Sequence, residues 1–198
     1  MAHNVDKMVF TGKRPWWYGT SAQGTAVGVD LGENAVTSDV AIKEAGLDWD
    51  VLVAQAGWRD DRATDLDGRP VWREGEGHRL LVRETDGAVL GACKQGYQVV
   101  QNRDAFRYLD GIVAEGGGRY HTAGSLERGR RVWILMQTPE SWTIRRRSGA
   151  TNHHHAFILN VLDHGGSNGD KLMATDVRAE CANTVSMADL AATGQALV

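Results

Sequence analysis

Arginine gathers in one part of this chain, between residues 119 and 147. That stretch holds seven arginines and two acidic residues, a net charge of +5, whereas the whole chain of 198 residues has a formal net charge of -3. Guanidinium groups neutralise phosphates, and aromatic rings beside them stack on any base at roughly 1–3 kcal/mol per base. The pattern therefore favours a sequence-independent contact with single-stranded nucleic acid.

The candidate nucleic-acid contacts are cationic side chains of two predicted hairpins and one ring beside them. They are Arg79, Arg83, Arg128, Arg130, Arg131, Trp142, Arg145, Arg146, Arg147 and Lys171. We expect the arginines of the second half to line one concave track. The alternative interpretation is a solvated hairpin tip, because arginines lie mostly on ordinary protein surfaces.

Trp16, Trp17 and Tyr18 form an aromatic cluster in a segment, residues 1–37, that has no sustained period and several glycines. We expect this segment to be an extended arm rather than a regular element. Its rings are candidates for an interface with another protein or for base stacking. The alternative is that they pin the arm onto its own domain.

His153 and His155 would point the same way from an extended chain, as two metal ligands could. A closed site needs a further ligand, for which Asp163, His164 and Cys181 are candidates. We expect a partly exposed histidine cluster and no bound metal. A metal-dependent hydrolase that uses His153, His155 and Asp163 is the minor alternative.

Other chemical motifs fail on their context. Residues 165–169 match a nucleophile elbow, but a strand rather than a helix is predicted after them, so we expect a hairpin loop. Cys93 and Cys181 are far apart and are expected to be reduced core residues. We therefore predict no catalytic residue and no cofactor.

The elements that position these residues centre on a hairpin and a helix between residues 78 and 115. Leu80 and Val82 alternate with Arg79, Leu81 and Arg83, which is the period of a strand. Asp86-Gly87 predicts a tight type I′ turn, and residues 89–93 return as a second strand. An amphipathic helix follows, capped by Asn102 and ended by the glycines at 116–118. We expect its apolar stripe to pack on the hairpin.

The remaining elements are predicted from shorter signals. Helices are expected at 39–45 and after Asn183 or Thr184, strands at 49–54, 120–126, 130–138, 142–146, 156–162 and 172–178, and a polar loop at 59–70. These elements predict an α+β fold with an antiparallel sheet, a β-β-β-α core and one main helix packed on the sheet. We expect an arm at 1–37 and a single domain at 38–198.

The composition is that of an ordinary soluble protein, with 42% hydrophobic and 24% charged residues. No run is long enough for a membrane span, and no basic stretch followed by an apolar one begins the chain. We therefore expect a cytoplasmic location.

Several blocks resemble a phage/plasmid-like family defined by a domain of unknown function (932). They are Met1-Ala-His-Asn, Met8, Pro15-Trp16 with Gly19, Tyr97-Gln-Val-Val-Gln-Asn102 with Phe106, Ala123-Gly-Ser-Leu126, Gly129-Arg-Arg-Val-Trp133 and Cys181-Ala-Asn-Thr184. Trp17 departs from the family, which usually has a histidine there. The resemblance implies a phage or plasmid context, a bacterial host cell and a native chain that continues past Val198.

The β-β-β-α order also resembles, by topology alone, single-strand annealing recombinases. That resemblance implies binding of single-stranded DNA, annealing of complementary strands without a cofactor, and assembly into a homo-oligomeric ring or filament. The alternative is a protein-interaction module, such as an inhibitor of a host defence protein. Apolar surface patches, rather than an arginine track, would distinguish it.

Overall fold

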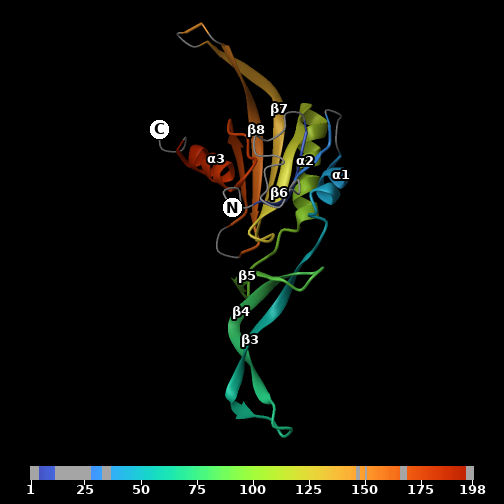
Figure 1. The fold of residues 1–198 in the computed structure, drawn as a ribbon, viewed down its shortest axis with the longest axis vertical. Helices are drawn as coiled ribbons and strands as arrows, with labels where there is room; N and C mark the ends of the chain where they lie inside the picture. The colour runs from blue at the N-terminus through green and yellow to red at the C-terminus, as the bar shows by residue number, and fades with distance from the viewer. Residues whose placement is uncertain are drawn as a thin grey trace.

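A computed structural model describes residues 5–11, 28–32, 37–145, 148–149, 151–165 and 169–194, which form an α+β fold built mostly of antiparallel sheet (Figure 1). The strands are β1 (Val5–Phe10), β2 (Gly28–Asp30), β3 (Val51–Thr64), β4 (Pro70–Arg83), β5 (Val89–Lys94), β6 (Arg119–Leu126), β7 (Arg131–Arg145), β8 (Thr151–Asp163) and β9 (Lys171–Thr175). The helices are α1 (Ser38–Glu44), α2 (Asn102–Gly116) and α3 (Ala182–Gly194).

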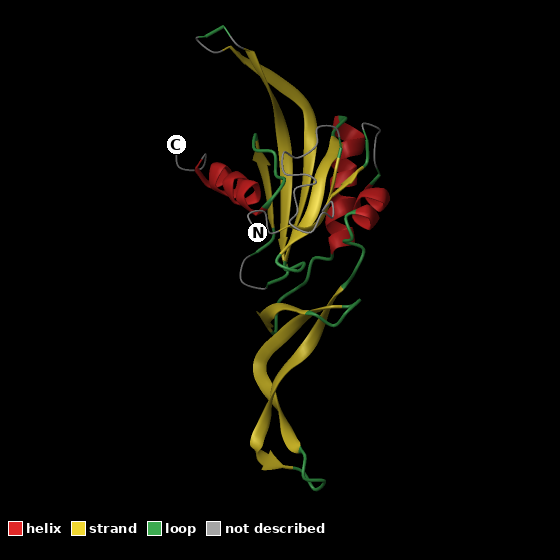
Figure 2. Cartoon of the chain, in the orientation of Figure 1, coloured by secondary structure: helices red, strands yellow, loops and turns green. Residues whose placement is uncertain are grey.

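The larger sheet has six strands in the order β2-β1-β6-β7-β8-β9, all antiparallel except the β1–β2 pair. Helices α1 and α2 cover one face and α3 lies on the other (Figure 2). The middle of β7 is buried on both faces, as its apolar run predicted. Ile134 belongs to the core that contains Phe106 of α2, and Trp133 belongs to the core that contains Val185 of α3.

The N-terminal segment contributes two strands to this sheet. We expected no regular element before residue 37, and that prediction is wrong, because β1 lies between β2 and β6. Met8, Val9 and Phe10 are all buried, so β1 has apolar side chains on both faces and shows no period of two. The aromatic cluster at residues 16–18 lies outside the described residues.

The smaller sheet has the order β3-β4-β5 and projects from the body (Figure 1). Because β5 pairs only with residues 78–82 of β4, the outer halves of β3 and β4 form a two-stranded hairpin. From here on this hairpin, and not the N-terminal segment 1–37, is called the arm. The prediction of a polar loop at 59–70 is therefore wrong except for the turn between β3 and β4. The arm has polar residues exposed on both faces, so its strands lack the hydrophobic alternation that identifies a strand.

Helix α2 is confirmed, and Gly117 ends it in the left-handed region with a φ of 66°. Its predicted packing is corrected, because its main partners are α1 and β7 of the larger sheet. The hairpin before it supplies only part of the same core, including Leu81 and Leu90. The helix thus covers a sheet whose strands mostly follow it in the sequence.

The hairpin turn at residues 84–88 also differs from the prediction. Of Asp86 and Gly87 only the glycine has a positive φ, so the turn is not type I′. Instead the Asp86 carboxylate accepts a hydrogen bond of 3.1 Å from the Ala88 N–H, and the loop is longer than two residues. An aspartate that bonds to the backbone two residues on builds such a loop without a second positive φ.

The ends of two other elements depend on single side chains. Helix α3 begins at Ala182, so the prediction that it follows a cap at Asn183 or Thr184 is wrong. Thr184 lies in the first turn, and its Oγ1 accepts a hydrogen bond of 2.9 Å from the Cys181 N–H. Cys93 and Cys181 are both buried and free, as predicted. The histidine run is part of β8 rather than a segment before it.

The N-cap of α2 is Gln101 and not Asn102, which we had predicted. The buried side chain of Asn102 donates to the Leu47 carbonyl at 2.9 Å and accepts from His164 Nε2 at 2.8 Å. His164 also meets the Trp49 ring edge to face. Burial lowers the pKa of His164 to about 4, so it is neutral at neutral pH with its proton on Nε2. This contact joins β8, α2 and the segment before β3.

Folding stability should therefore fall as the pH drops from about 6.5 toward 4. An unfolded histidine takes up a proton near pH 6.5, whereas folded His164 does not until about pH 4, so acid favours the unfolded chain. Between pH 7.5 and 5.5 this group contributes about 1 kcal/mol to the decrease. Urea unfolding at both pH values should show a smaller decrease for His164→Gln than for the wild type. An equal decrease in the variant contradicts the assignment, and His78→Gln at an exposed position is the control.

Candidate nucleic-acid interface

Four predicted arginines of the second half, Arg128, Arg130, Arg131 and Arg145, lie in two groups at opposite ends of β7. Arg128, Arg130 and Arg131 surround the turn between β6 and β7, whereas Arg145 is the last residue of β7. Fifteen residues of strand separate the two ends, about 50 Å at the usual rise. The prediction of one continuous track is therefore wrong. The reason is that the two strands predicted at 130–138 and 142–146 are a single strand with an irregularity after Gln137.

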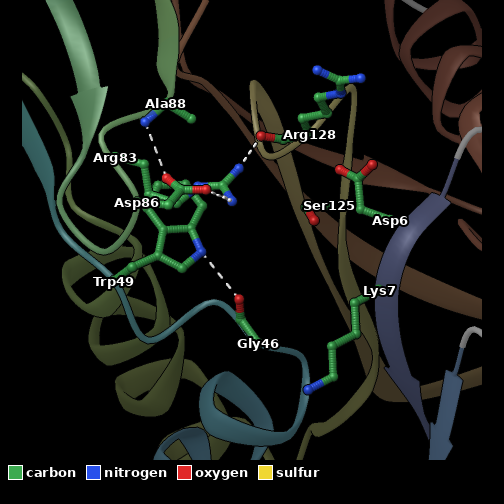
Figure 3. Close-up of a pocket in the computed structure, with 9 residues that line it drawn as sticks. All are labelled: Asp6, Lys7, Gly46, Trp49, Arg83, Asp86, Ala88, Ser125 and Arg128. Atoms are coloured by element: carbon green, nitrogen blue, oxygen red, sulfur yellow. Dashed lines mark hydrogen bonds and ion pairs between the residues drawn. The ribbon is translucent and has the colours of Figure 1, made fainter.

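At the first end, a pocket of about 420 Å³ lies where the two sheets meet (Figure 3). Arg83 lies over the Trp49 ring at 4.9 Å from its centroid and donates to the carbonyl of Arg128. It also pairs with Asp86 at 3.3 Å. The side chain of Arg83 is only 19% exposed, so its guanidinium is committed to contacts within the protein.

These contacts hold an unusual turn. Glu127 and Arg128 have φ values of 55° and 59°, and the Gly129 N–H donates to the Leu126 carbonyl at 3.1 Å. Two positive φ values in succession define a type I′ turn, which L-residues with a side chain adopt at a cost. The Gly129 N–H also donates to the Asp6 carboxylate at 2.9 Å. Arg83 and Asp6 therefore stabilise this strained turn from β4 and β1.

The other predicted contacts are scattered. Arg79 donates to Gln55 across the smaller sheet, and Arg130 lies against Gly165 next to Asp163. Lys171 is exposed at the start of β9. Arg146 and Arg147 lie outside the described residues.

At the second end, β7 and β8 extend past their neighbours as a two-stranded hairpin, here called the ribbon (Figure 1). It consists of residues 141–145 and 151–155. The Trp142 ring stacks on His154 with centroids 5.9 Å apart and planes at 11°, and Trp142 is 41% exposed. On the other side, Thr143 contacts His153 at 3.2 Å, and strand alternation places Arg145 with them.

A second pocket, here called the root pocket, lies where the ribbon leaves the sheet. It encloses about 380 Å³ and combines arginines with histidines. Its lining is Arg119, His121, Gln137, His153, His154, His155, Phe157, Asp176 and Arg178. We did not predict Arg119, His121 or Arg178 as site residues. They come from β6 and from the segment after β9, and no local pattern links them.

The comparisons with known proteins concern the second half of the chain. A family model described as a domain of unknown function, DUF932, matches residues 89–197. The chain belongs to the DUF932 family. No curated protein and no solved structure matches the chain. The matched part of this DUF932 protein contains the ribbon and the root pocket, whereas β3 and β4 precede it.

Two features are not found in the described part of this DUF932 protein. Among the described residues, no group of three or more His, Cys, Asp or Glu side chains is placed to hold a metal ion. No helix in the described ranges is long and apolar enough to span a membrane.

The strained turn yields a test that separates structure from binding. Arg128→Gly should raise the free energy of unfolding by about 1 kcal/mol, because glycine adopts a positive φ without the penalty of an L side chain. Arg130→Gly is the matched control and should not stabilise, because its φ is not positive. Urea unfolding measures both, and a destabilised Arg128→Gly protein would show that the Arg128 side chain itself supports the fold.

Proposed function

We propose that this protein binds single-stranded DNA at the ribbon and helps complementary strands to anneal. The proposal rests on a row of hydrogen-bond donors that runs along one side of the ribbon and into the root pocket. Arg145, His153 and His155 occupy alternate positions on that side, and Arg119 and Arg178 line the pocket below them. Arg145, Arg119 and Arg178 are the cations of this row, and cations together with hydrogen-bond donors suit a phosphate backbone.

The opposite side of the ribbon supports the same proposal. The exposed ring of Trp142, held in a stack by His154, is a platform of the kind on which bases of any sequence stack. The ribbon is narrow, only two strands wide, so a flexible single strand can reach both of its sides. A two-stranded ribbon also fits the major groove of a duplex, so the test includes duplex DNA.

The annealing part of the proposal rests on resemblance. The sequence resembles phage/plasmid-like proteins, and its β-β-β-α order resembles that of strand-annealing recombinases. We extend the proposal accordingly to a homo-oligomeric ring or filament that acts in the bacterial cytoplasm without a cofactor. The β3-β4-β5 meander precedes α2 in the chain, but α2 packs on the larger sheet, so the resemblance lies in the order of elements alone.

A second candidate function, a protein-interaction module, is favoured by the arm. Trp58 and Trp72 are 46% and 61% exposed, and the turn residue Leu66 is fully exposed. The Trp72 ring lies on Gly57, where a Cβ atom would come within 2.5 Å of it. A two-stranded hairpin such as the arm is marginally stable alone, and it gains stability when its exposed aromatic rings are buried against a partner. A second copy of the chain is one such partner.

Fluorescence anisotropy with a labelled oligonucleotide tests the DNA-binding proposal. Arg145→Glu should weaken binding about tenfold and reduce the salt slope by about 1, because a phosphate contact becomes a repulsion. Trp142→Ala should cost about 1–3 kcal/mol, the value of one stacked base. Arg69→Glu, the same charge change on the turn of the arm, is the control and should have no effect.

The wild type must bind single strands in a salt-sensitive way at micromolar concentration. If it does not, or if it prefers duplex DNA, the proposal is wrong. Annealing is measured separately, as the rate at which two complementary labelled strands pair with and without the protein.

The arm is tested by measuring the mass in solution. Trp58→Ser with Trp72→Ser should shift the mass distribution in analytical ultracentrifugation toward the monomer and leave the affinity for DNA unchanged, because the arm lies far from the ribbon (Figure 1). Trp142→Ser, at a comparably exposed tryptophan, is the matched control. An unchanged mass distribution in the double variant removes the arm from self-association.

A further inference from the structure

The root pocket occupies a defined row of the larger sheet. Arg119, Gln137, Phe157 and Thr175 are directly opposite one another across β6, β7, β8 and β9. In this row β6 begins and β9 ends, and above it only the ribbon continues. The pocket therefore has a floor of four paired strands and opens toward the ribbon.

Two arginines line the pocket, and each is held by polar contacts. Arg119 donates to Gln137 Oε1 through Nε at 3.2 Å and through Nη2 at 3.0 Å. It forms no ion pair with any described residue. Arg178 pairs with Glu180 at 2.5 Å and donates from Nε to His121 Nδ1 at 3.3 Å. Arg119, which has no ion-pair partner among the described residues, is therefore the guanidinium better suited to an anion, because Nη1 and Nε of Arg178 are already engaged within the protein.

His121 adds a neutral donor. It is 8% exposed and meets the Phe157 ring edge to face. Because its Nδ1 accepts from Arg178, its proton lies on Nε2. Burial, together with the charges of Arg178 and Arg119, lowers the pKa of His121 to about 3. The ring therefore contributes an N–H without adding charge.

The composition of the pocket favours an anion over a cation. Its lining contains Arg119, Arg178 and one acidic residue, Asp176; the charge of Arg178 is paired with Glu180, so Arg119 supplies the positive charge that is not paired with a described carboxylate. His155 and His153 lie on the ribbon side of the opening. Planar guanidinium donors together with imidazole N–H groups match the tetrahedral oxygens of phosphate.

We infer that the root pocket binds a phosphate group, supplied either by a strand end or by the backbone of a bound strand. The identity of the ligand, a nucleic-acid phosphate, rests on the proposed function, whereas the presence of a phosphate site does not. A phosphate seated there would fix the point at which a strand enters the ribbon. Arg145 would then lie further along the same side.

Isothermal titration of the full chain with inorganic phosphate at constant ionic strength tests the site directly. We expect a dissociation constant of about 1 mM. Arg119→Gln should weaken it at least about tenfold, because it removes a charged donor while leaving the exposed position polar. Arg69→Gln, on the arm, is the matched control, and Arg145→Glu at the ribbon tip should leave phosphate binding unchanged.

A second variant guards against loss of folding. Arg178→Gln combined with Glu180→Gln removes the cation without leaving its carboxylate partner unpaired, and it should also weaken phosphate binding. Absence of phosphate binding to the wild type, or undiminished binding to both variants, overturns the inference. Neither result affects salt-sensitive DNA binding at the ribbon tip, so the proposed function would stand.

Oligonucleotides with and without a 5′-phosphate distinguish the two sources of phosphate. Tighter binding of the phosphorylated strand, lost in Arg119→Gln, assigns the pocket to a strand end. Equal binding of both strands, with competition by inorganic phosphate, assigns it to the backbone. Phosphate binding without any binding of oligonucleotide would support the pocket and contradict the proposed function.

Discussion

β7 and β8 are paired from Arg131 opposite Asp163 to Arg145 opposite Thr151, with one irregularity between Gln137 and Ser141. In the lower part of this ladder both faces are buried, and Trp133, Ile134, Leu135 and Leu159 are fully buried. In the upper part, no other described strand pairs with these two. An isolated hairpin of this length would be marginally stable in water, so the ribbon depends on the buried half of its own strands.

The root pocket is a consequence of the same arrangement. Side chains in the middle of a sheet are surrounded by paired strands, whereas the residues at strand ends have one open side. Arg119 is the first residue of β6, and Asp176 and Arg178 follow the end of β9. Both ends fall on the row in which the ribbon emerges. Charged residues can therefore gather there without being enclosed by the core.

The sequence predicted best those elements whose apolar residues form a stripe or an unbroken run buried in the core. Helix α2 has a buried stripe that includes Phe106 and Leu109, and its period and its terminal glycine were sufficient to locate it. The centre of β7 was recognisable because a long apolar run is typical of a strand buried on both faces. In such segments the order of apolar and polar residues directly reflects which side chains pack in the core.

The arm and the ribbon were predicted poorly for a common physical reason. A two-stranded ribbon exposes both faces, so polar and apolar residues need not alternate, and Asp60 or His153 can stand in a strand as easily as in a loop. Asp60 is stabilised there by Arg73, whose hydrogen bond lowers the pKa of the carboxyl group. Partners on the neighbouring strand, rather than a period along the chain, maintain these strands.

The candidate site was harder to predict than the fold, because a local sum of charge does not identify the partner of each charge. Arg83 was expected to contact phosphate, yet Trp49, Asp86 and the carbonyl of Arg128 occupy it. Arg178 carried no local signal, and its contact with His121 spans 57 residues. The +5 stretch is divided between a turn that its own protein stabilises and a ribbon that projects into solvent. The net charge of +5 in this segment is therefore not concentrated on one surface of the folded protein.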